Sequence, residues 1–122
     1  AQATMHGHNT DVDGPALRLH VNGDGGNIDP ISFPWKPTPG KWYHVAITRS
    51  TNDFTLYIDG AAVKKTTVAV TIPNPAAPLT IGSAEAYNLN GKLDEVEIYN
   101  QALSAKEIKA LYLDGKAGRC KK

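Results

Sequence analysis

The dipeptide Asp59-Gly60 lies between two segments whose side chains follow the pattern of β-strands. Phe54, Leu56 and Ile58 alternate with Thr and Tyr, and residues 62–70 are rich in β-branched side chains. A two-residue type I′ turn needs positive φ at both central positions, which Asp-Gly accommodates well. The sequence therefore predicts an antiparallel hairpin over residues 54–70.

Further short segments have the alternation or the composition of strands. Turn residues or prolines separate them from one another. They are residues 17–21, 31–33, 42–48, 79–81 and 92–99. Many short strands at this spacing predict an all-β fold in which two antiparallel sheets pack as a sandwich.

One short helix is predicted at the C-terminal end. Ser104 is a good N-cap, and Glu107 three positions later completes a capping box. Leu103 and Ile108 occupy the positions of a hydrophobic staple, and Gly115 suits the C′ position that ends a helix. The predicted helix therefore starts after Ser104.

The chain of 122 residues is long enough for one domain with a core. We divide it into a polar N-terminal arm, residues 1–16, and a folded domain, residues 17–122. The net charge of +1 gives no global field to attract nucleic acid, and no apolar run approaches the ~20 residues of a membrane span. The single cysteine, Cys120, cannot form an internal disulfide.

Three motifs carry a resemblance to a known family. Residues 42–48 read Trp-Tyr-His-Val-Ala-Ile-Thr, residues 56–60 read Leu-Tyr-Ile-Asp-Gly, and residues 91–96 read Gly-Lys-Leu-Asp-Glu-Val. Together with the capped helix they resemble bacterial laminin-G-like domains of the concanavalin A-like lectin/glucanase superfamily. The resemblance implies an antiparallel jelly-roll sandwich that binds a glycan or a protein ligand, often with calcium, in a secreted or cell-surface protein.

The segment before Trp42 is shorter than in this family, whose members usually carry several strands there. The chain is then a compact variant, a fragment of a longer protein, or a protein that takes its missing strands from a neighbouring chain. Unpaired sheet edges template pairing with other chains. A structural subunit that self-associates through a sheet edge or the N-terminal arm is therefore the alternative to a ligand-binding module.

Two oxygen-rich loops are candidate calcium sites. Asp11 and Asp13 precede a glycine in the N-terminal arm, and Asp24, Asn27 and Asp29 follow the first predicted strand. Calcium prefers several oxygen ligands around a sharp turn, so both loops have suitable chemistry. The alternative is Asx-turn chemistry, which explains the same residues without a metal.

Aromatic residues in loops are the candidate ligand contacts. A sugar stacks its apolar face on an aromatic ring, while nearby amides and carboxylates bind its hydroxyls. Trp35 lies between prolines, and Tyr87 lies in a loop that also holds Asn88 and Asn90. Ligands of jelly-roll lectins commonly sit at such loops, and the alternative for both aromatics is packing within the loop.

Catalysis is the least favoured interpretation. Glu95 and Glu97 would share one face of the predicted strand 92–99, and paired carboxylates can cleave glycosides. The glucanase motif has a third carboxylate on that face, where this chain has Tyr99. We therefore predict a solvated strand face and no enzymatic activity.

Overall fold

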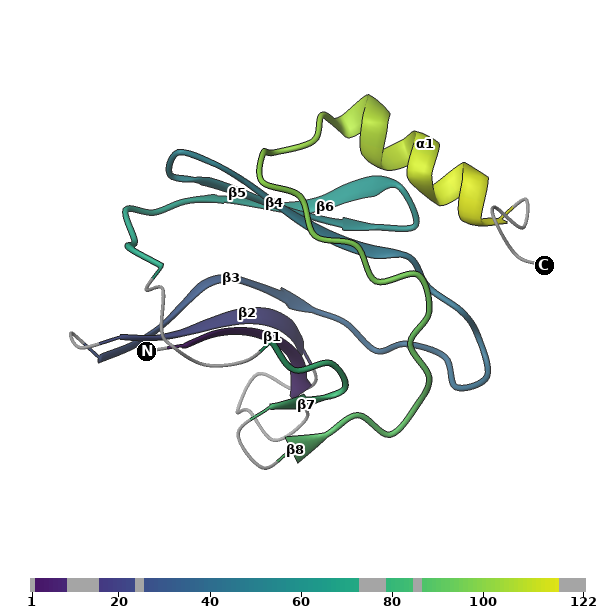
Figure 1. Cartoon of the computed structure of the whole chain (residues 1–122), viewed down its shortest axis with the longest axis horizontal. Helices are drawn as coiled ribbons and strands as arrows, with labels where there is room; N and C mark the ends of the chain where they lie inside the picture. The colour runs from purple at the N-terminus through teal and green to yellow at the C-terminus, as the bar shows by residue number, and fades with distance from the viewer. Residues whose placement is uncertain (1, 9–15, 24–25, 73–78, 85–86, 117–122) are drawn as a thin grey trace.

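The computed structural model describes residues 2–8, 16–23, 26–72, 79–84 and 87–116. Two three-stranded antiparallel sheets, with strand orders β1-β2-β3 and β4-β5-β6, lie face to face, and a helix covers the outer face of the second (Figure 1). The strands are β1 Gln2–His8, β2 Ala16–Gly23, β3 Gly26–Pro34, β4 Val45–Ser50, β5 Asp53–Ile58, β6 Ala61–Thr67, β7 Ser83–Ala84 and β8 Tyr87–Asn88. The helix α1 spans Ala105–Lys116. The predicted two-sheet β-sandwich with one C-terminal helix is confirmed at this level.

The first sheet includes a strand that the sequence interpretation missed. We expected residues 1–16 to form an arm outside the domain, but Gln2–His8 pairs with β2 in antiparallel register from Gln2↔Asn22 to His8↔Ala16. Polar residues alternate with Ala, Met and Gly in this segment. Ala and Gly form strands weakly, so this pattern does not predict a strand, and the pairing with β2 decides the conformation of the segment.

The core lies between the two sheets. Leu17 and Ile31 come from the first sheet and pack against Phe54 and Leu56 from the second, and all four side chains are buried. Tyr57 is also buried, and strand alternation places it on the opposite face of β5 from Phe54 and Leu56. This is the face of the sheet over which α1 lies (Figure 1). Strand β5 is therefore covered on one face by the first sheet and, at Tyr57, also on the other face.

The predicted hairpin and helix start are both confirmed. Asp59 and Gly60 have φ values of 51° and 78°, as a type I′ turn requires, and Ile58 pairs with Ala61 across it. The backbone N–H of Glu107 donates to the Ser104 hydroxyl, while the backbone N–H of Ser104 donates to the Glu107 carboxylate. The helix continues past Gly115 to Lys116, so the predicted C′ role of Gly115 is wrong.

Two predicted strands are absent. Residues 79–81 and 92–99 were predicted as strands from their side-chain pattern. In the described part of the chain neither segment pairs with another strand. A strand needs a neighbour to satisfy its backbone, so alternation alone is insufficient. Each three-stranded sheet is a simple meander in sequence order, and the jelly-roll connectivity stays a prediction.

Candidate functional site

Trp35, a predicted ligand contact, lies directly after β3 and is half-buried against the core. Its indole meets the Tyr43 ring edge to face, with centroids 5.1 Å apart and planes at 84°. The Lys41 ammonium lies 4.8 Å from the centre of the Tyr43 ring. These contacts pack Trp35 within the proline-rich connection between β3 and β4. A role of Trp35 in ligand contact stays a prediction.

Tyr43 is held in this cluster by a hydrogen bond. The backbone N–H of Thr38 donates to the Tyr43 hydroxyl oxygen at 2.9 Å. Hydrogen bonding from Thr38 lowers the pKa of Tyr43 below its ordinary value of 10.0, because a donor to this oxygen stabilises the phenolate. The connection between β3 and β4 is therefore fixed around an aromatic pair.

The second predicted ligand loop forms a small hairpin. Strands β7 and β8 pair through Ser83↔Asn88 and Ala84↔Tyr87, and the hairpin lies at the far end of the molecule from α1 (Figure 1). Asn88 and Asn90 are exposed. The side chain of Tyr87 lies outside the described part, so its predicted contact with a ligand is not tested.

The candidate calcium ligands are only partly described. Asp11, Asp13 and Asp24 lie outside the described residues, and Asn27 is described as backbone in β3. Asp29 Oδ2 lies 3.2 Å from the Arg18 guanidinium, and Asp29 Oδ1 lies 2.6 Å from His20 Nδ1. Among the described residues no group of three His, Cys, Asp or Glu could hold a metal ion. Calcium therefore stays a prediction, and at Asp29 it would compete with two basic side chains.

The segment 92–99 does not present a pair of carboxylates on a strand face. Glu95 has a φ of 52°, a left-handed conformation that interrupts any extended alternation. Glu97 accepts a hydrogen bond from the Tyr99 hydroxyl. The expectation that Glu95 and Glu97 share one strand face is thus wrong, because the segment has no strand partner here.

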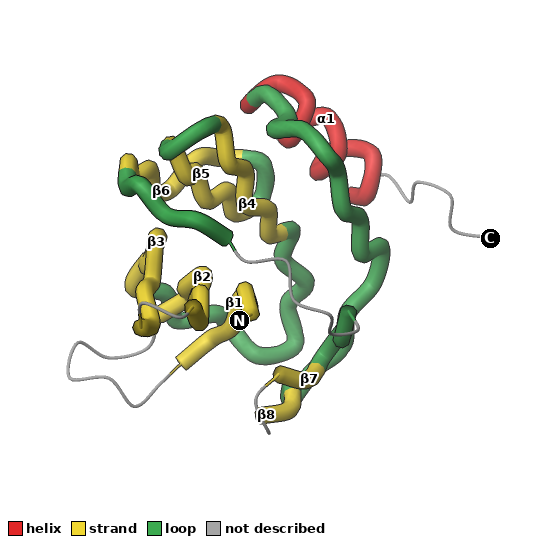
Figure 2. The backbone as a smooth tube through the Cα atoms, turned by 60° about the vertical axis from the view of Figure 1, so that its left-hand side comes forward, coloured by secondary structure: helices red, strands yellow, loops and turns green. Residues whose placement is uncertain are grey.

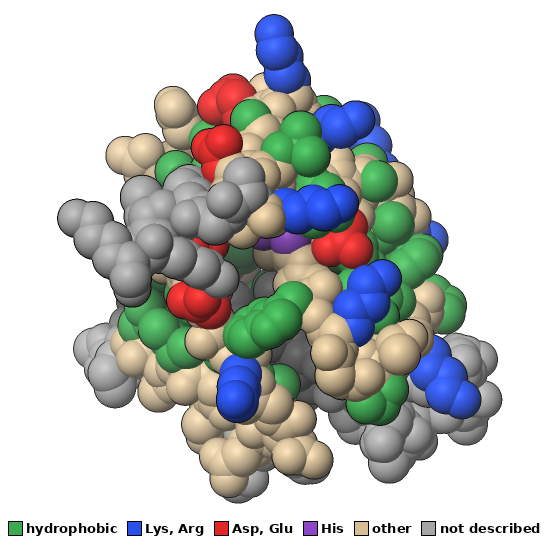
Figure 3. Space-filling model, turned by 90° about the vertical axis from the view of Figure 1, so that its right-hand side faces the viewer, with side chains coloured by type: hydrophobic (Ala, Val, Ile, Leu, Met, Phe, Trp, Pro, Cys, Tyr) green, Lys and Arg blue, Asp and Glu red, His purple; other side chains and the backbone are tan. Residues whose placement is uncertain are grey.

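Large apolar side chains are exposed in the connection before β4 and in the segments after β6. Leu79, Ile98 and Trp42 have exposed fractions of 70%, 72% and 61%, and Ile81, Leu89, Leu93 and Val96 are also exposed. Figure 3 shows apolar side chains spread over one face among basic and acidic groups. Apolar side chains spread in this way among charged groups are normal on a protein surface, so this face alone does not identify a binding site.

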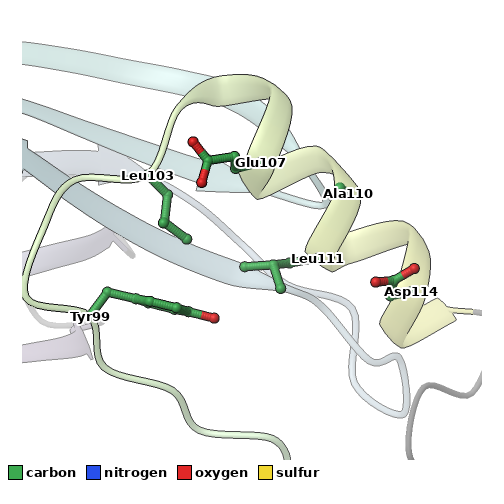
Figure 4. A pocket seen from close by; sticks show the side chains of 6 residues that line it. All are labelled: Tyr99, Leu103, Glu107, Ala110, Leu111 and Asp114. Carbon is green, nitrogen blue, oxygen red and sulfur yellow. The ribbon is translucent and has the colours of Figure 1, made fainter.

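A pocket of about 230 Å³ lies between α1 and the segment that precedes it (Figure 4). The Tyr99 ring forms one wall, and Leu103 and Leu111 project toward it. Two carboxylates, Glu107 and Asp114, line the pocket from the helix, and Ala110 completes it. The arrangement combines an aromatic ring, an aliphatic wall and hydrogen-bond acceptors.

Sequence reasoning missed this pocket. The spacing of residues 107, 110, 111 and 114 does place them on one side of the helix, and residue 103 lies just before its start. Nothing in the pattern indicated that residue 99 would lie across from that side, because this depends on the path of an irregular segment. Figure 2 shows this segment as the loop between β8 and α1.

Comparison with known proteins gives two results. A laminin G family model, described as the concanavalin A-like lectin/glucanases superfamily, matches residues 4–109. A crystal structure of an S-layer domain-containing protein (residues 221–444) from Clostridium thermocellum ATCC 27405 is similar, with 25% sequence identity and a TM-score of 0.57. The match covers 90% of this chain and 63% of that one, so the chain spans less than two thirds of that structure. No functionally curated protein matches the chain.

No helix in the described residues has both the length and the apolar character needed to cross a membrane.

Proposed function

The chain belongs to the concanavalin A-like lectin/glucanase superfamily, and from this premise we propose that it is a non-catalytic module that binds a glycan or protein ligand. The similarity to an S-layer domain-containing protein supports a place outside the cell or at its surface. The two sheets are part of a jelly roll in this proposal, as the family implies. Ligand recognition, not chemistry, is the proposed activity.

The observation that carries the proposal is the pocket beside α1. A sugar has an apolar face and a rim of hydroxyls, so it fits a site with an aromatic wall and nearby carboxylates. Tyr99 supplies the ring, and Glu107 and Asp114 supply acceptors. Glu107 Oε1 already accepts from the Ser104 backbone at 3.3 Å, so this carboxylate is fixed in position by the helix cap.

Calcium dependence is the finer part of the proposal. The acidic loops with Asp11, Asp13, Asp24, Asn27 and Asp29 supply oxygen ligands of the type calcium prefers. A calcium ion bound there would coordinate a ligand hydroxyl directly. Trp35, Tyr87, Asn88 and Asn90 remain alternative ligand contacts.

A glycan-array screen of the whole chain, in calcium and again in EDTA, tests the proposal. We expect binding that Tyr99→Ala abolishes and Tyr99→Phe retains, because the ring and not the hydroxyl forms the wall. Leu113→Ala is the matched control, since Leu113 is exposed on the same helix but does not line the pocket.

Each outcome decides one part of the proposal. Loss of binding in EDTA establishes calcium dependence, and binding kept in EDTA removes calcium. Binding that survives Tyr99→Ala moves the site to Trp35 or to the β7–β8 hairpin. If the folded chain binds no glycan in either condition, the proposal of a glycan ligand is wrong.

Assembly is the second candidate function, and a specific observation favours it. Leu93, Val96 and Ile98, in the segment between β8 and α1, are exposed by 54%, 52% and 72%. Packing of a second chain on these side chains would remove apolar surface from water. Light scattering on dilute protein tests this function, and a stable monomer argues against it.

A further inference from the structure

The pocket beside α1 carries a negative charge at each end. Glu107 lies in the first turn of the helix and Asp114 in its last turn, and Figure 4 shows Leu111 between them. The other residues that line the pocket are apolar or aromatic, and none of the lining residues is basic. The pocket therefore offers charged acceptors to a ligand and no positive charge of its own.

The chain does not neutralise these two carboxylates. In the part of the chain that the structure describes, the ion pairs involve Asp29 in the first sheet, and no lysine or arginine pairs with Glu107 or Asp114. The Glu107 carboxylate accepts a hydrogen bond from the backbone N–H of Ser104, through Oε1 alone. Both carboxylates are thus available to a positively charged ligand.

The end of the pocket at Asp114 has further sources of negative potential. The C-terminal end of a helix carries a partial negative charge from its last carbonyl groups. A Cβ atom placed on Gly115 would lie 3.4 Å from Glu95 Oε2, so a third carboxylate lies beside this turn. Lys116 offsets part of this charge, but it forms no ion pair with Asp114 within the described residues.

The walls of the pocket suit a cation with an apolar body. The Tyr99 ring forms one wall, and the face of an aromatic ring attracts a positive charge. The hydroxyl of Tyr99 donates to the Glu97 carboxylate, which places another negative group at the tip of this ring. Leu103 and Leu111 supply aliphatic contacts.

The distance between the two carboxylates favours a ligand with more than one ammonium group. Glu107 and Asp114 are seven residues apart, so their backbones are separated by roughly 10 Å along the helix axis. One ammonium group cannot contact both carboxylates across this distance. A glycan with an amine on each successive sugar presents ammonium groups at intervals, and an apolar sugar face fits the aromatic wall.

We propose that the pocket beside α1 binds a cationic glycan, in which the sugars carry free, protonated amino groups. The inference rests on the ligand-binding function proposed above and names the chemical class of the ligand. A neutral glycan would cover the carboxylates without supplying a counter-charge, which costs free energy. An acidic glycan would be repelled.

Isothermal titration calorimetry of the whole chain with two matched probes, in the presence of calcium, tests the inference. One probe is a β-1,4-linked tetramer of glucosamine, and the other is its fully N-acetylated form. The probes share their linkage and length but differ in charge. We expect the amine form to bind about tenfold more tightly or better, and its affinity to fall as salt is added.

Single substitutions locate the binding site. Glu107→Gln keeps the helix cap, since glutamine also serves at this position of a capping box, and Asp114→Asn keeps the side-chain size. Each should weaken binding of the amine form about three- to fivefold, as expected for loss of one exposed ion pair, and leave binding of the N-acetylated form unchanged. Asp53→Asn, which removes the same charge outside the pocket, should bind like the original chain.

Circular dichroism checks that each variant is folded. Equal or tighter binding of the N-acetylated form overturns the inference and leaves the glycan-binding function standing. Binding of the amine form that Glu107→Gln and Asp114→Asn do not weaken also overturns it, as does equally tight binding of tetralysine, which would point to a basic protein segment as the ligand. A chain that binds neither probe, but binds another glycan on the array, overturns the cationic class alone.

Discussion

Replacement of Gly60 by alanine tests how the helix sits on the second sheet. Gly60 is the second residue of the β5–β6 turn, and it has a φ of 78°. A Cβ atom added there would lie 3.0 Å from Tyr112 Cδ1 and 3.4 Å from the Lys109 Cα. The turn and α1 therefore approach each other so closely that a methyl group at Gly60 would require Tyr112 to shift slightly.

The chain offers a matched control at Gly40. Its φ is 81°, but a Cβ atom there would meet nothing within 4 Å. A left-handed conformation costs an alanine about 1–2 kcal/mol, and both replacements change the unfolded chain in the same way. The difference between the two variants thus isolates the contact with the helix.

We expect Gly40→Ala to lower the free energy of unfolding by about 1 kcal/mol, which is the backbone cost. Gly60→Ala adds the cost of a forced shift in a packed contact, which is typically about 1–3 kcal/mol, so its total should be about 2–4 kcal/mol. Denaturant unfolding, followed by the fluorescence of the two tryptophans, measures both values.

A double variant completes the experiment. In a Tyr112→Ala background the ring is gone, so Gly60→Ala should cost about as much as Gly40→Ala. Equal costs for Gly40→Ala and Gly60→Ala in the original chain would refute the reasoning, because α1 would then not rest on the β5–β6 turn in solution.

Three further predictions concern the core, the helix cap and the aromatic cluster. Phe54→Ala should lower the free energy of unfolding by about 3–5 kcal/mol, because Phe54 is fully buried between the sheets; thermal unfolding with no shift would place the core elsewhere. Ser104→Ala should cost about 1 kcal/mol, while Ser104→Asp should restore the cap, as measured by urea unfolding. Tyr43 should titrate below the ordinary tyrosine pKa of 10.0 in an absorbance titration, and this early phase should vanish in Tyr43→Phe. The stability that the Tyr43 phenolate contributes is present above a pH of 10.0 and is lost as the pH falls through the lowered pKa.

Some elements were predictable because their cause is local. The Asp59-Gly60 turn follows from the φ values that a two-residue hairpin needs, and Ser104 with Glu107 satisfies the first turn of the helix by itself. The alternation of side chains in residues 54–58 also places Phe54 and Leu56 on one face of the strand, and this face lies in the core. These features depend on a few neighbouring residues, so the sequence contains all the information.

Other elements depend on a distant partner and were not predictable in the same way. Residues 2–8 become a strand because β2 is available beside them, although their own composition is weak. Residues 92–99 have the better strand pattern and form none, because no described strand lies alongside. A strand forms only where a second segment is available to pair with it, so the sequence of one segment is not sufficient to predict it.

The sequence by itself thus determined the family, the sandwich class, the central hairpin and the capped helix, because each rests on local backbone preference or on a short motif. Only the tertiary structure decided that Trp35 packs against Tyr43, that Asp29 pairs with Arg18 and His20, and that Tyr99 faces α1 across a pocket. These contacts join residues from different elements through irregular connections. Their geometry depends on how the sheets and the helix stack, and side-chain pattern along the chain does not encode that arrangement.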